Sequence, residues 1–253
     1  MSVSLKELEL ELKQVLRPEQ FKDYCPNGLQ VEGKKEISKL VTGVTACQEL
    51  IEAAVEAGAD ALLVHHGYFW RGEDQSISGI KKSRIETLLK HDVSLLAYHL
   101  PLDVHKDFGN NVQLAEVLGF SIEGELGKQN NHPIGLTGSL NQDLDFSSLR
   151  TLIGDKLERQ PLGIEGKSKR IKTVAWCTGA AQNYIELAVA ANVDAYITGE
   201  VSEPTVHIAR ESGIHFFSAG HHATERYGVQ ALGGYLATKF GLDHEFIDID
   251  NPV

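Results

Sequence analysis

The chain has 253 residues, of which 42% are hydrophobic and 23% charged, so it can form a soluble globular protein of one large or two modest domains. Its formal net charge of −11 at pH 7 disfavours broad binding to nucleic acid, because phosphate backbones are bound by clustered Lys and Arg. No apolar run approaches the roughly 20 residues of a membrane-spanning helix.

The first predicted element is an amphipathic helix over residues 1–15, where Leu alternates with Glu and Lys. This charge pattern is not that of a signal peptide. The cysteines, Cys25, Cys47 and Cys177, stand too far apart for a CxxC zinc motif or a disulfide framework. We therefore expect a cytoplasmic protein whose cysteines stay reduced.

The rest of the chain predicts alternating strands and helices in two similar halves. Residues 51–61 and residues 185–195 are identical at seven of eleven positions, and both have helical periodicity. Strand-like apolar runs flank both helices, at residues 39–44 and 62–64 in the first half and at residues 172–177 and 196–198 in the second. This alternation is typical of βαβ units around a mostly parallel sheet.

The similarity continues along the chain. After a further apolar run, each half predicts a helix (residues 111–118 and 225–240) and a closing strand (residues 121–125 and 245–250). We therefore expect an α/β fold of two similar lobes, residues 1–127 and residues 128–253, with a crossover at residues 124–138.

Histidines stand at the ends of three predicted strands: His65 and His66 after residues 61–64, His99 after residues 95–98, and His221 and His222 after residues 216–220. Open α/β sheets keep their sites beyond the carboxyl ends of their strands. Two carboxylates, Asp103 and Glu225, stand close by in the sequence, and imidazole with carboxylate suits many divalent metals. The sequence therefore predicts a metal site in the cleft between the two lobes.

The spacing of the carboxylates supports this prediction. His221 and Glu225 are four residues apart, so they share one face of a helix and can reach one point. Asp103 follows Pro101, which restrains the loop that carries the carboxylate. Bridging carboxylates, with each histidine serving one ion, suit a dinuclear centre, which lowers the pKa of a bound water to about 7.

Three separated motifs resemble the signature of the Nif-three-like family: residues 65–67 (His-His-Gly), residues 99–103 (His-Leu-Pro-Leu-Asp) and residues 220–225 (Gly-His-His-Ala-Thr-Glu). Residues 26–31 (Pro-Asn-Gly-Leu-Gln-Val) resemble its N-terminal element. The similarity covers the whole chain, whose length is that of the compact YbgI-like branch, labelled GTP cyclohydrolase 1 type 2 homologs. One difference is Pro26, which stands where relatives often have an acidic residue before the asparagine.

The resemblance implies a two-lobed α/β protomer in a ring-shaped homohexamer, with two divalent metal ions per subunit in the interlobe cleft. It implies the metal ligands His65, His66, Asp103, His221 and Glu225, with the two carboxylates as bridges. His99 and His222 lie beside these ligands, and we expect them to orient a ligand or to transfer a proton. Iron, manganese, zinc, nickel and cobalt all accept such ligands, so the identity of the metal stays open.

Two functions follow from these features. The first is a metal-dependent hydrolase that acts on a nucleotide or related heterocycle through a metal-activated hydroxide, with Glu200 either near the site or a surface carboxylate. The sequence has no Walker loop, so the GTP cyclohydrolase type 2 activity follows from the family label alone. The alternative is a metal-stabilised ring that binds nucleic acid or protein without catalysis, which the absence of cysteine ligands disfavours.

Overall fold

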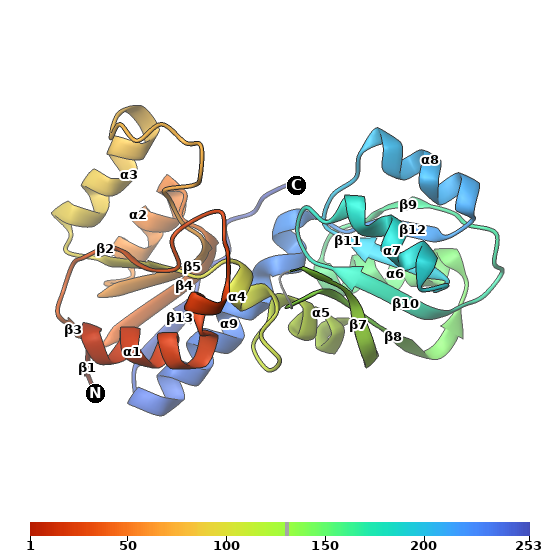
Figure 1. Cartoon of the computed structure of the whole chain (residues 1–253). Coiled ribbons are helices and arrows are strands. Elements are labelled where there is room, and N and C mark those ends of the chain that lie inside the picture. The colour runs from red at the N-terminus through yellow and green to blue at the C-terminus, as the bar shows by residue number, and fades with distance from the viewer. Residues whose placement is uncertain (130–131) are drawn as a thin grey trace. The chain divides into compact units, whose positions relative to one another are not determined.

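The computed structural model describes residues 1–129 and 132–253, and the chain divides into two compact units (Figure 1). Unit 1 comprises Met1–Phe108 and Gly228–Asp250, and unit 2 comprises Gly109–Tyr227 and Asn251–Val253. Helix α9 (His221–Phe240) begins in unit 2 and ends in unit 1. No helix in the described ranges combines the length and the apolar character that crossing a bilayer requires.

Unit 1 contains a five-stranded sheet with the strand order β13-β4-β5-β6-β2. Its parallel strands are β4 (Lys39–Thr45), β5 (Ala61–His66), β6 (Ser94–Ala97) and β13 (Asp243–Phe246), and β2 (Gly28–Val31) is antiparallel to β6. A small second sheet pairs β1 (Val3–Ser4) with β3 (Glu36–Ile37). The helical segments are α1 (Leu5–Leu16), η1 (Pro18–Gln20), α2 (Gln48–Glu56), α3 (Gly79–Lys90) and α4 (Leu100–Asp103).

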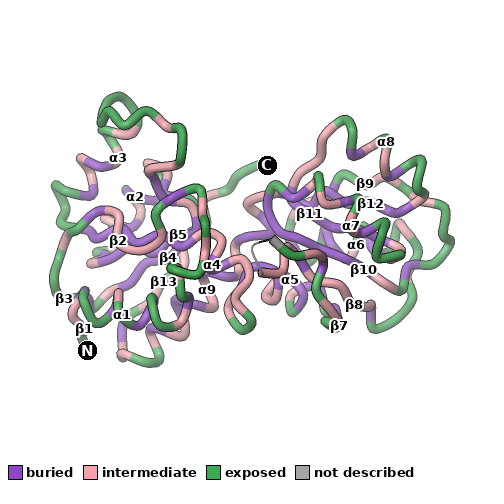
Figure 2. The backbone as a smooth tube through the Cα atoms, in the orientation of Figure 1, coloured by how far each residue is buried: buried purple, intermediate pink, exposed green. Residues whose placement is uncertain are grey.

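Helices cover both faces of this sheet because both faces of its central strands are apolar and buried (Figure 2). Alternate residues of a strand point to opposite faces. Leu40 and Leu63 therefore pack with α1 and α9, whereas Val41 and Leu62 pack with α2 and α3. The predicted N-terminal helix is confirmed as α1, which starts with a capping box at Ser4.

Unit 2 contains a six-stranded sheet with the strand order β7-β8-β10-β11-β12-β9. The parallel strands are β10 (Ile171–Cys177), β11 (Ala195–Thr198) and β12 (His215–Ser218). The antiparallel strands are β7 (Phe120–Gln129), β8 (His132–Leu144) and β9 (Leu162–Ile164). The helical segments are α5 (Asn110–Leu118), α6 (Phe146–Leu157), η2 (Gln182–Tyr184), α7 (Ile185–Ala190) and α8 (Glu203–Ser212).

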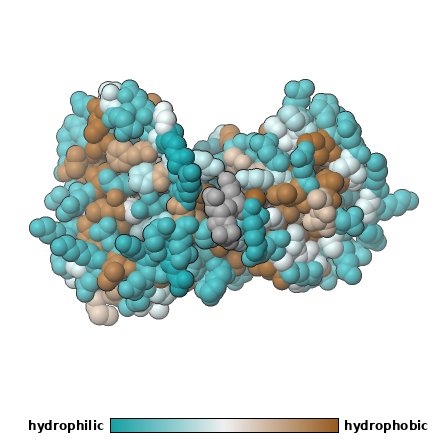
Figure 3. Space-filling model, in the orientation of Figure 1, coloured by the Kyte–Doolittle hydropathy of each residue, from teal (hydrophilic) through white to brown (hydrophobic). Residues whose placement is uncertain are grey.

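The sheet of unit 2 is also covered on both faces. Trp176 and Phe217 pack with α5 and α6, whereas Tyr196 and Phe216 pack with α7 and α8. All four of these aromatic side chains are fully buried. Hydrophilic side chains cover much of the visible face of each unit, with hydrophobic side chains in patches (Figure 3).

The predicted mixed α/β fold is confirmed, and the two sheets share one arrangement. In unit 1 the parallel strands β4, β5 and β6 follow one another across the sheet, joined by α2 and α3. In unit 2 the strands β10, β11 and β12 do the same, joined by α7 and α8. In both sheets an antiparallel strand then pairs with the last of the three.

The units divide the chain differently from the expected boundary at residue 127. Strand β13 pairs with β4 of the first sheet, so residues 228–250 belong to unit 1 although they follow unit 2 in the sequence. The expected crossover at residues 124–138 is instead part of β7 and β8, which pair with each other antiparallel. Residues 130 and 131 of that stretch lie outside the described residues.

Candidate metal centre

The first histidine doublet lies at the carboxyl end of β5, the central strand of the sheet in unit 1. His65 is fully buried, and its Nδ1 donates a hydrogen bond to the backbone carbonyl of Tyr98 at 3.0 Å. That bond leaves the lone pair on Nε2, which lies 3.4 Å from Oδ1 of Asp103. His65 therefore presents a metal-binding nitrogen beside a carboxylate oxygen.

His66, the last residue of β5, is held in a similar way. Its Nδ1 lies 3.1 Å from the hydroxyl oxygen of Thr45 on the neighbouring strand β4. His65, His66 and His99 each offer a ring nitrogen, and these three nitrogens lie within 4.8 Å of one another. Unit 1 thus brings three of the predicted histidines together at one end of its sheet.

Asp103 ends the short helix α4, which follows His99 and has Pro101 in its first turn. The backbone N–H of Asp103 donates to the carbonyl of His99 at 3.1 Å. This tight turn returns the carboxylate to the end of β6, where it meets His65. Proline, with its fixed φ and missing N–H, suits the first turn of such a helix.

The N-terminal element that contains Asn27 and Gln30 holds both histidine-bearing segments of unit 1. Oδ1 of Asn27 accepts a hydrogen bond from the backbone N–H of His99 at 2.7 Å. Oε1 of Gln30 accepts one from the backbone N–H of Tyr68 at 2.7 Å, and Nε2 donates to the Tyr68 carbonyl at 3.2 Å. A Cβ at Gly67 would overlap Oε1 of Gln30, so this close fit requires glycine directly after the doublet.

Asp23 is a supporting residue that the sequence interpretation missed. Its side chain is 3% exposed, and its carboxylate accepts four hydrogen bonds. The donors are Nδ1 of His99 (2.7 Å), the backbone N–H groups of Tyr24 (2.6 Å) and Leu100 (3.0 Å), and the Asn27 amide (2.8 Å). Burial alone would raise the pKa of Asp23, but these bonds and the charge of His99 outweigh it and lower the pKa.

Cys25 also lies close, since Asp23, Cys25 and His99 offer atoms within 4.8 Å of one another. The carboxylate of Asp23 is already occupied by its four donors. Burial, with the charges of Asp23 and Asp103, raises the pKa of Cys25 to about 12, so the thiol is protonated at neutral pH. A protonated thiol is a poor metal ligand, so we assign Asp23 to the support of His99.

Asp23→Asn is expected to lower the free energy of unfolding by about 1–3 kcal/mol. The amide nitrogen of the new side chain cannot accept the hydrogen bonds that one of the carboxylate oxygens now accepts, so buried donors lose their acceptor. Urea unfolding of the variant and the parent chain measures this change. Asp107→Asn is the control, since that carboxylate is 53% exposed and pairs with Lys106 at the surface. The control is expected to change stability by less than about 0.5 kcal/mol. An Asp23→Asn chain as stable as the parent would contradict the assigned role.

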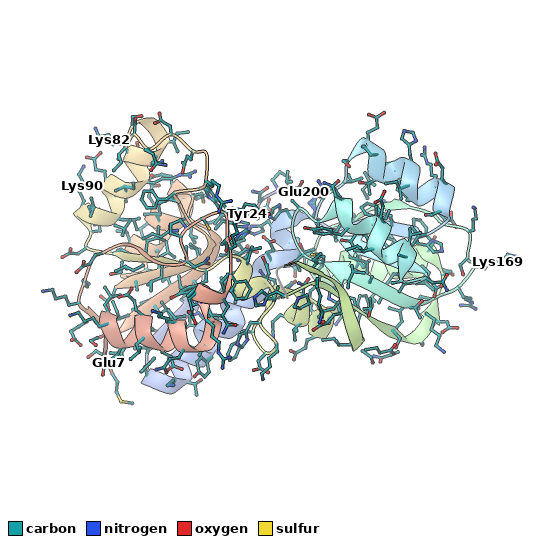
Figure 4. All side chains as sticks on the ribbon, viewed as in Figure 1. Glu7, Tyr24, Lys82, Lys90, Lys169 and Glu200 are labelled. Carbon is teal, nitrogen blue, oxygen red and sulfur yellow. The ribbon has the colours of Figure 1, made fainter. Side chains whose placement is uncertain are left out.

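The second histidine doublet opens helix α9, after β12, in unit 2. Nε2 of His221 lies 3.1 Å from Oε2 of Glu225, one helical turn later, and Glu225 is 3% exposed. Nδ1 of His221 lies 2.7 Å from Oε1 of Glu200, which follows β11 (Figure 4). Glu200 therefore orients His221. The backbone N–H of His222 donates to the carbonyl of Val253 at 3.0 Å.

The two carboxylates control the charge of His221. Burial alone would lower its pKa, but hydrogen bonds to Glu225 and Glu200, together with their negative charges, raise the pKa to about 9. A half-buried imidazole between two carboxylates is in an environment that stabilises positive charge. The donor chemistry of this cluster therefore fits a divalent cation as well as a proton.

Comparison with known proteins places these residues in a family. Residues 3–252 match the family described as Duf34/NIF3 (NGG1p interacting factor 3). The chain belongs to the Duf34/NIF3 family. It is 55% identical over 252 residues to a Pseudomonas aeruginosa protein named GTP cyclohydrolase 1 type 2 homolog, with all of both chains covered.

Solved structures agree with this membership. The chain matches a structure titled protein ybgI, of unknown function, with 48% identity, a TM-score of 0.95, and 99% of this chain and 100% of that chain covered. It also matches TTHA1606 from Thermus thermophilus with 32% identity, a TM-score of 0.90, and the same coverage. The predicted family and the mixed α/β fold are thus confirmed over nearly the whole chain.

In this Duf34/NIF3 chain the predicted donors fall into two clusters. Unit 1 brings together His65, His66, His99 and Asp103, and unit 2 brings together His221 and Glu225 with Glu200. Each cluster combines imidazole nitrogens with carboxylate oxygens, as divalent metals of the first transition series prefer. The geometry of these donors therefore allows metal binding, while the number and identity of the ions stay predictions.

Proposed function

We propose that this chain is a dinuclear-metal-dependent hydrolase that acts on a nucleotide or a related heterocycle. The residues that would hold two divalent ions are His65, His66 and Asp103 of unit 1, and His221 and Glu225 of unit 2. The family resemblance implies that the two carboxylates would each serve both ions. The observation that carries the proposal is the shared orientation of the histidines. In His65, His66 and His221, Nδ1 contacts an oxygen of the protein, and the Nε2 atoms of His65 and His221 each lie beside a carboxylate oxygen.

His99 and the residues that hold it would transfer a proton beside the proposed metal ligands. When bound, the two ions would supply a hydroxide nucleophile near neutral pH and stabilise the negative charge that develops during attack. The Asp23 carboxylate holds a proton on Nδ1 of His99, so Nε2 of the same ring is the position that exchanges protons with a substrate. Trp70 packs edge-on against His99, with 5.0 Å between the ring centroids, and limits the motion of that ring.

The proposed substrate class follows from the relatives. Proteins 49–55% identical to this chain carry the name GTP cyclohydrolase 1 type 2 homolog, which points to hydrolysis of a nucleotide ring. A metal-dependent attack on an electrophilic carbon is consistent with donor clusters of imidazole and carboxylate that contain no thiolate ligand. His222, beside His221 at the start of α9, is the second candidate for proton transfer.

Elemental analysis of the purified chain tests this proposal. About two divalent ions per chain are expected, and His65→Ala is expected to lower that number. His207→Ala is the matched control, because this histidine is exposed on α8 and should leave the metal content unchanged. A parent chain that holds metal is then incubated with nucleotides, and products are separated by chromatography.

The results also distinguish the alternative function. A chain that binds no metal after reconstitution with several divalent ions would contradict the hydrolase proposal. A chain that binds two ions, hydrolyses no nucleotide, and loses its oligomeric ring when metal is removed would favour the metal-stabilised binding ring. Sedimentation of the metal-loaded and metal-free chain, with six copies expected from the family resemblance, provides that measurement.

A further inference from the structure

Unit 1 contains an open groove of about 860 Å³ beside α1 and η1. It is lined by the exposed side of α1, by the segment that leads into β2, and by Arg71. Pockets of about 300–1,000 Å³ are the usual size for small-molecule ligands. At one end the groove reaches Asp23, the carboxylate that holds His99. Asp23 therefore both lines the groove and contacts the histidine cluster of unit 1.

Cations outnumber anions along this groove, although the chain as a whole is strongly acidic. Lys6, Lys13 and Lys22 line it, and none of them forms an ion pair with any residue that the structure describes. Lys6 and Lys13 stand two helical turns apart on α1, so they point to the same side. Three lysines without anionic partners over one groove favour an anionic ligand.

Arg71 adds a cation whose position is fixed. Its guanidinium donates to the backbone carbonyl of Asp23 at 2.7 Å and lies 5.9 Å from the centroid of the Tyr24 ring. The opposing carboxylates are Glu9 and Glu19, because that of Asp23 is already occupied by four donors. The groove therefore keeps a positive balance.

A buried hydroxyl group also faces the groove. Tyr98 is 2% exposed and lines the groove, and no residue in the described part of the chain forms a hydrogen bond with its hydroxyl. Burial and the nearby charge of Glu9 raise the pKa of this hydroxyl, so it stays protonated and can donate. A Cβ at Gly28, whose φ is +121°, would lie 3.9 Å from it. Glycine at this position thus leaves space in front of the hydroxyl.

The remaining wall is apolar. Leu10 is 56% exposed on α1, and Leu29, Phe21 and Pro18 complete a surface that a planar ring can cover. Cationic side chains above an apolar wall, with a buried hydroxyl donor, match a molecule that has both a phosphate and a heterocycle.

We propose that this groove binds the phosphate-bearing part of a mononucleotide-sized ligand, with the phosphate against Lys6, Lys13 and Lys22 and the heterocycle against Leu10 and Tyr98. The role of this ligand as a substrate rests on the proposed hydrolase function. The binding itself does not, because the groove is built entirely from residues of unit 1 that are not among the proposed metal ligands.

The test is direct binding of common nucleoside 5′-monophosphates and the matching nucleosides to the full chain, by isothermal titration calorimetry at about 0.15 M salt. Both metal-loaded and metal-stripped protein are used. Monophosphates are expected to bind both forms, and about tenfold more tightly than nucleosides, because charge-assisted hydrogen bonds to phosphate are strong. The triple variant Lys6→Gln, Lys13→Gln, Lys22→Gln is expected to remove this preference for phosphate.

A charge-matched control separates the groove from the net charge. The variant Lys35→Gln, Lys82→Gln, Lys169→Gln removes three exposed lysines that do not line the groove, such as Lys82 on α3 (Figure 4). It is expected to bind monophosphates as the parent does. Tyr98→Phe is expected to weaken binding several-fold with an unchanged melting temperature, because its hydroxyl has no hydrogen-bond partner in the described part of the chain.

The outcomes separate this inference from the proposed function. Monophosphate binding that is absent from the parent chain, or equal in the parent and the triple lysine variant, would overturn the groove proposal even if the chain holds two metal ions. Binding that depends on the three lysines in a chain without metal would support the groove while the hydrolase proposal fails.

Discussion

Glu225→Gln is expected to lose both proposed metal ions, whereas His66→Ala is expected to keep one of them. Glutamine has nearly the shape of glutamate, but its amide has one acceptor oxygen and no charge, so it cannot bridge two cations. Glu225 is 3% exposed and already lies beside Nε2 of His221, so little water can replace its missing charge. His66 would serve one ion alone, and its loss leaves the bridges in place.

Metal content per folded chain, measured by elemental analysis after gel filtration, checks this prediction. Glu186→Gln is the matched control, because this glutamate is exposed in the first turn of α7 in the same unit. It is expected to keep the parent's metal content. Circular dichroism melting shows whether each variant folds. If folded Glu225→Gln holds as much metal as His66→Ala, Glu225 is not a bridge.

The positions of the histidines were predictable from the sequence because each follows a short apolar run. Such runs form buried parallel strands, and a polar residue at the end of such a run emerges at the carboxyl edge of the sheet. The contact between His221 and Glu225 was predictable for a similar reason, since helical periodicity is local. Strand ends and helix periodicity were therefore enough to predict which candidate ligands lie close together within each unit.

The supporting residues could not be predicted in this way. Asp23 holds His99 across 76 positions of the sequence, in a segment with no regular periodicity around it. Asp23 also accepts a hydrogen bond from the Asn27 amide, four positions downstream, and no local pattern of the sequence indicates this contact.

The division into units was also only partly predictable. Apolar alternation in residues 245–250 indicated a strand, but not which sheet it would join. Strand β13 pairs with β4 in parallel, a contact that depends on long-range packing of α9 against the first sheet. Hydrophobic pattern gives the type of an element more reliably than its partner.

Gly179→Ala is expected to disrupt the donor pair of unit 2 and to lower metal content strongly. Gly179 follows β10 with φ +69°, a conformation that costs an L-residue about 1–2 kcal/mol. A Cβ there would overlap Oε1 of Glu225 and lie 3.2 Å from Nε2 of His221. The backbone cannot easily shift to relieve this overlap, because the N–H of Gly179 donates a hydrogen bond to the Thr224 hydroxyl at 3.1 Å. The carboxylate must therefore move away from the imidazole.

Gly58→Ala provides a control with the same backbone strain and no steric contact. Gly58 has φ +77°, and a Cβ there would have no heavy atom within 4 Å. Both variants are expected to lose about 1–2 kcal/mol of stability from the left-handed conformation, and only Gly179→Ala is expected to lose metal. Urea unfolding and elemental analysis measure the two effects on the same samples. If Gly179→Ala matches Gly58→Ala in both stability and metal content, the fit of Gly179 against Glu225 does not shape the donor pair.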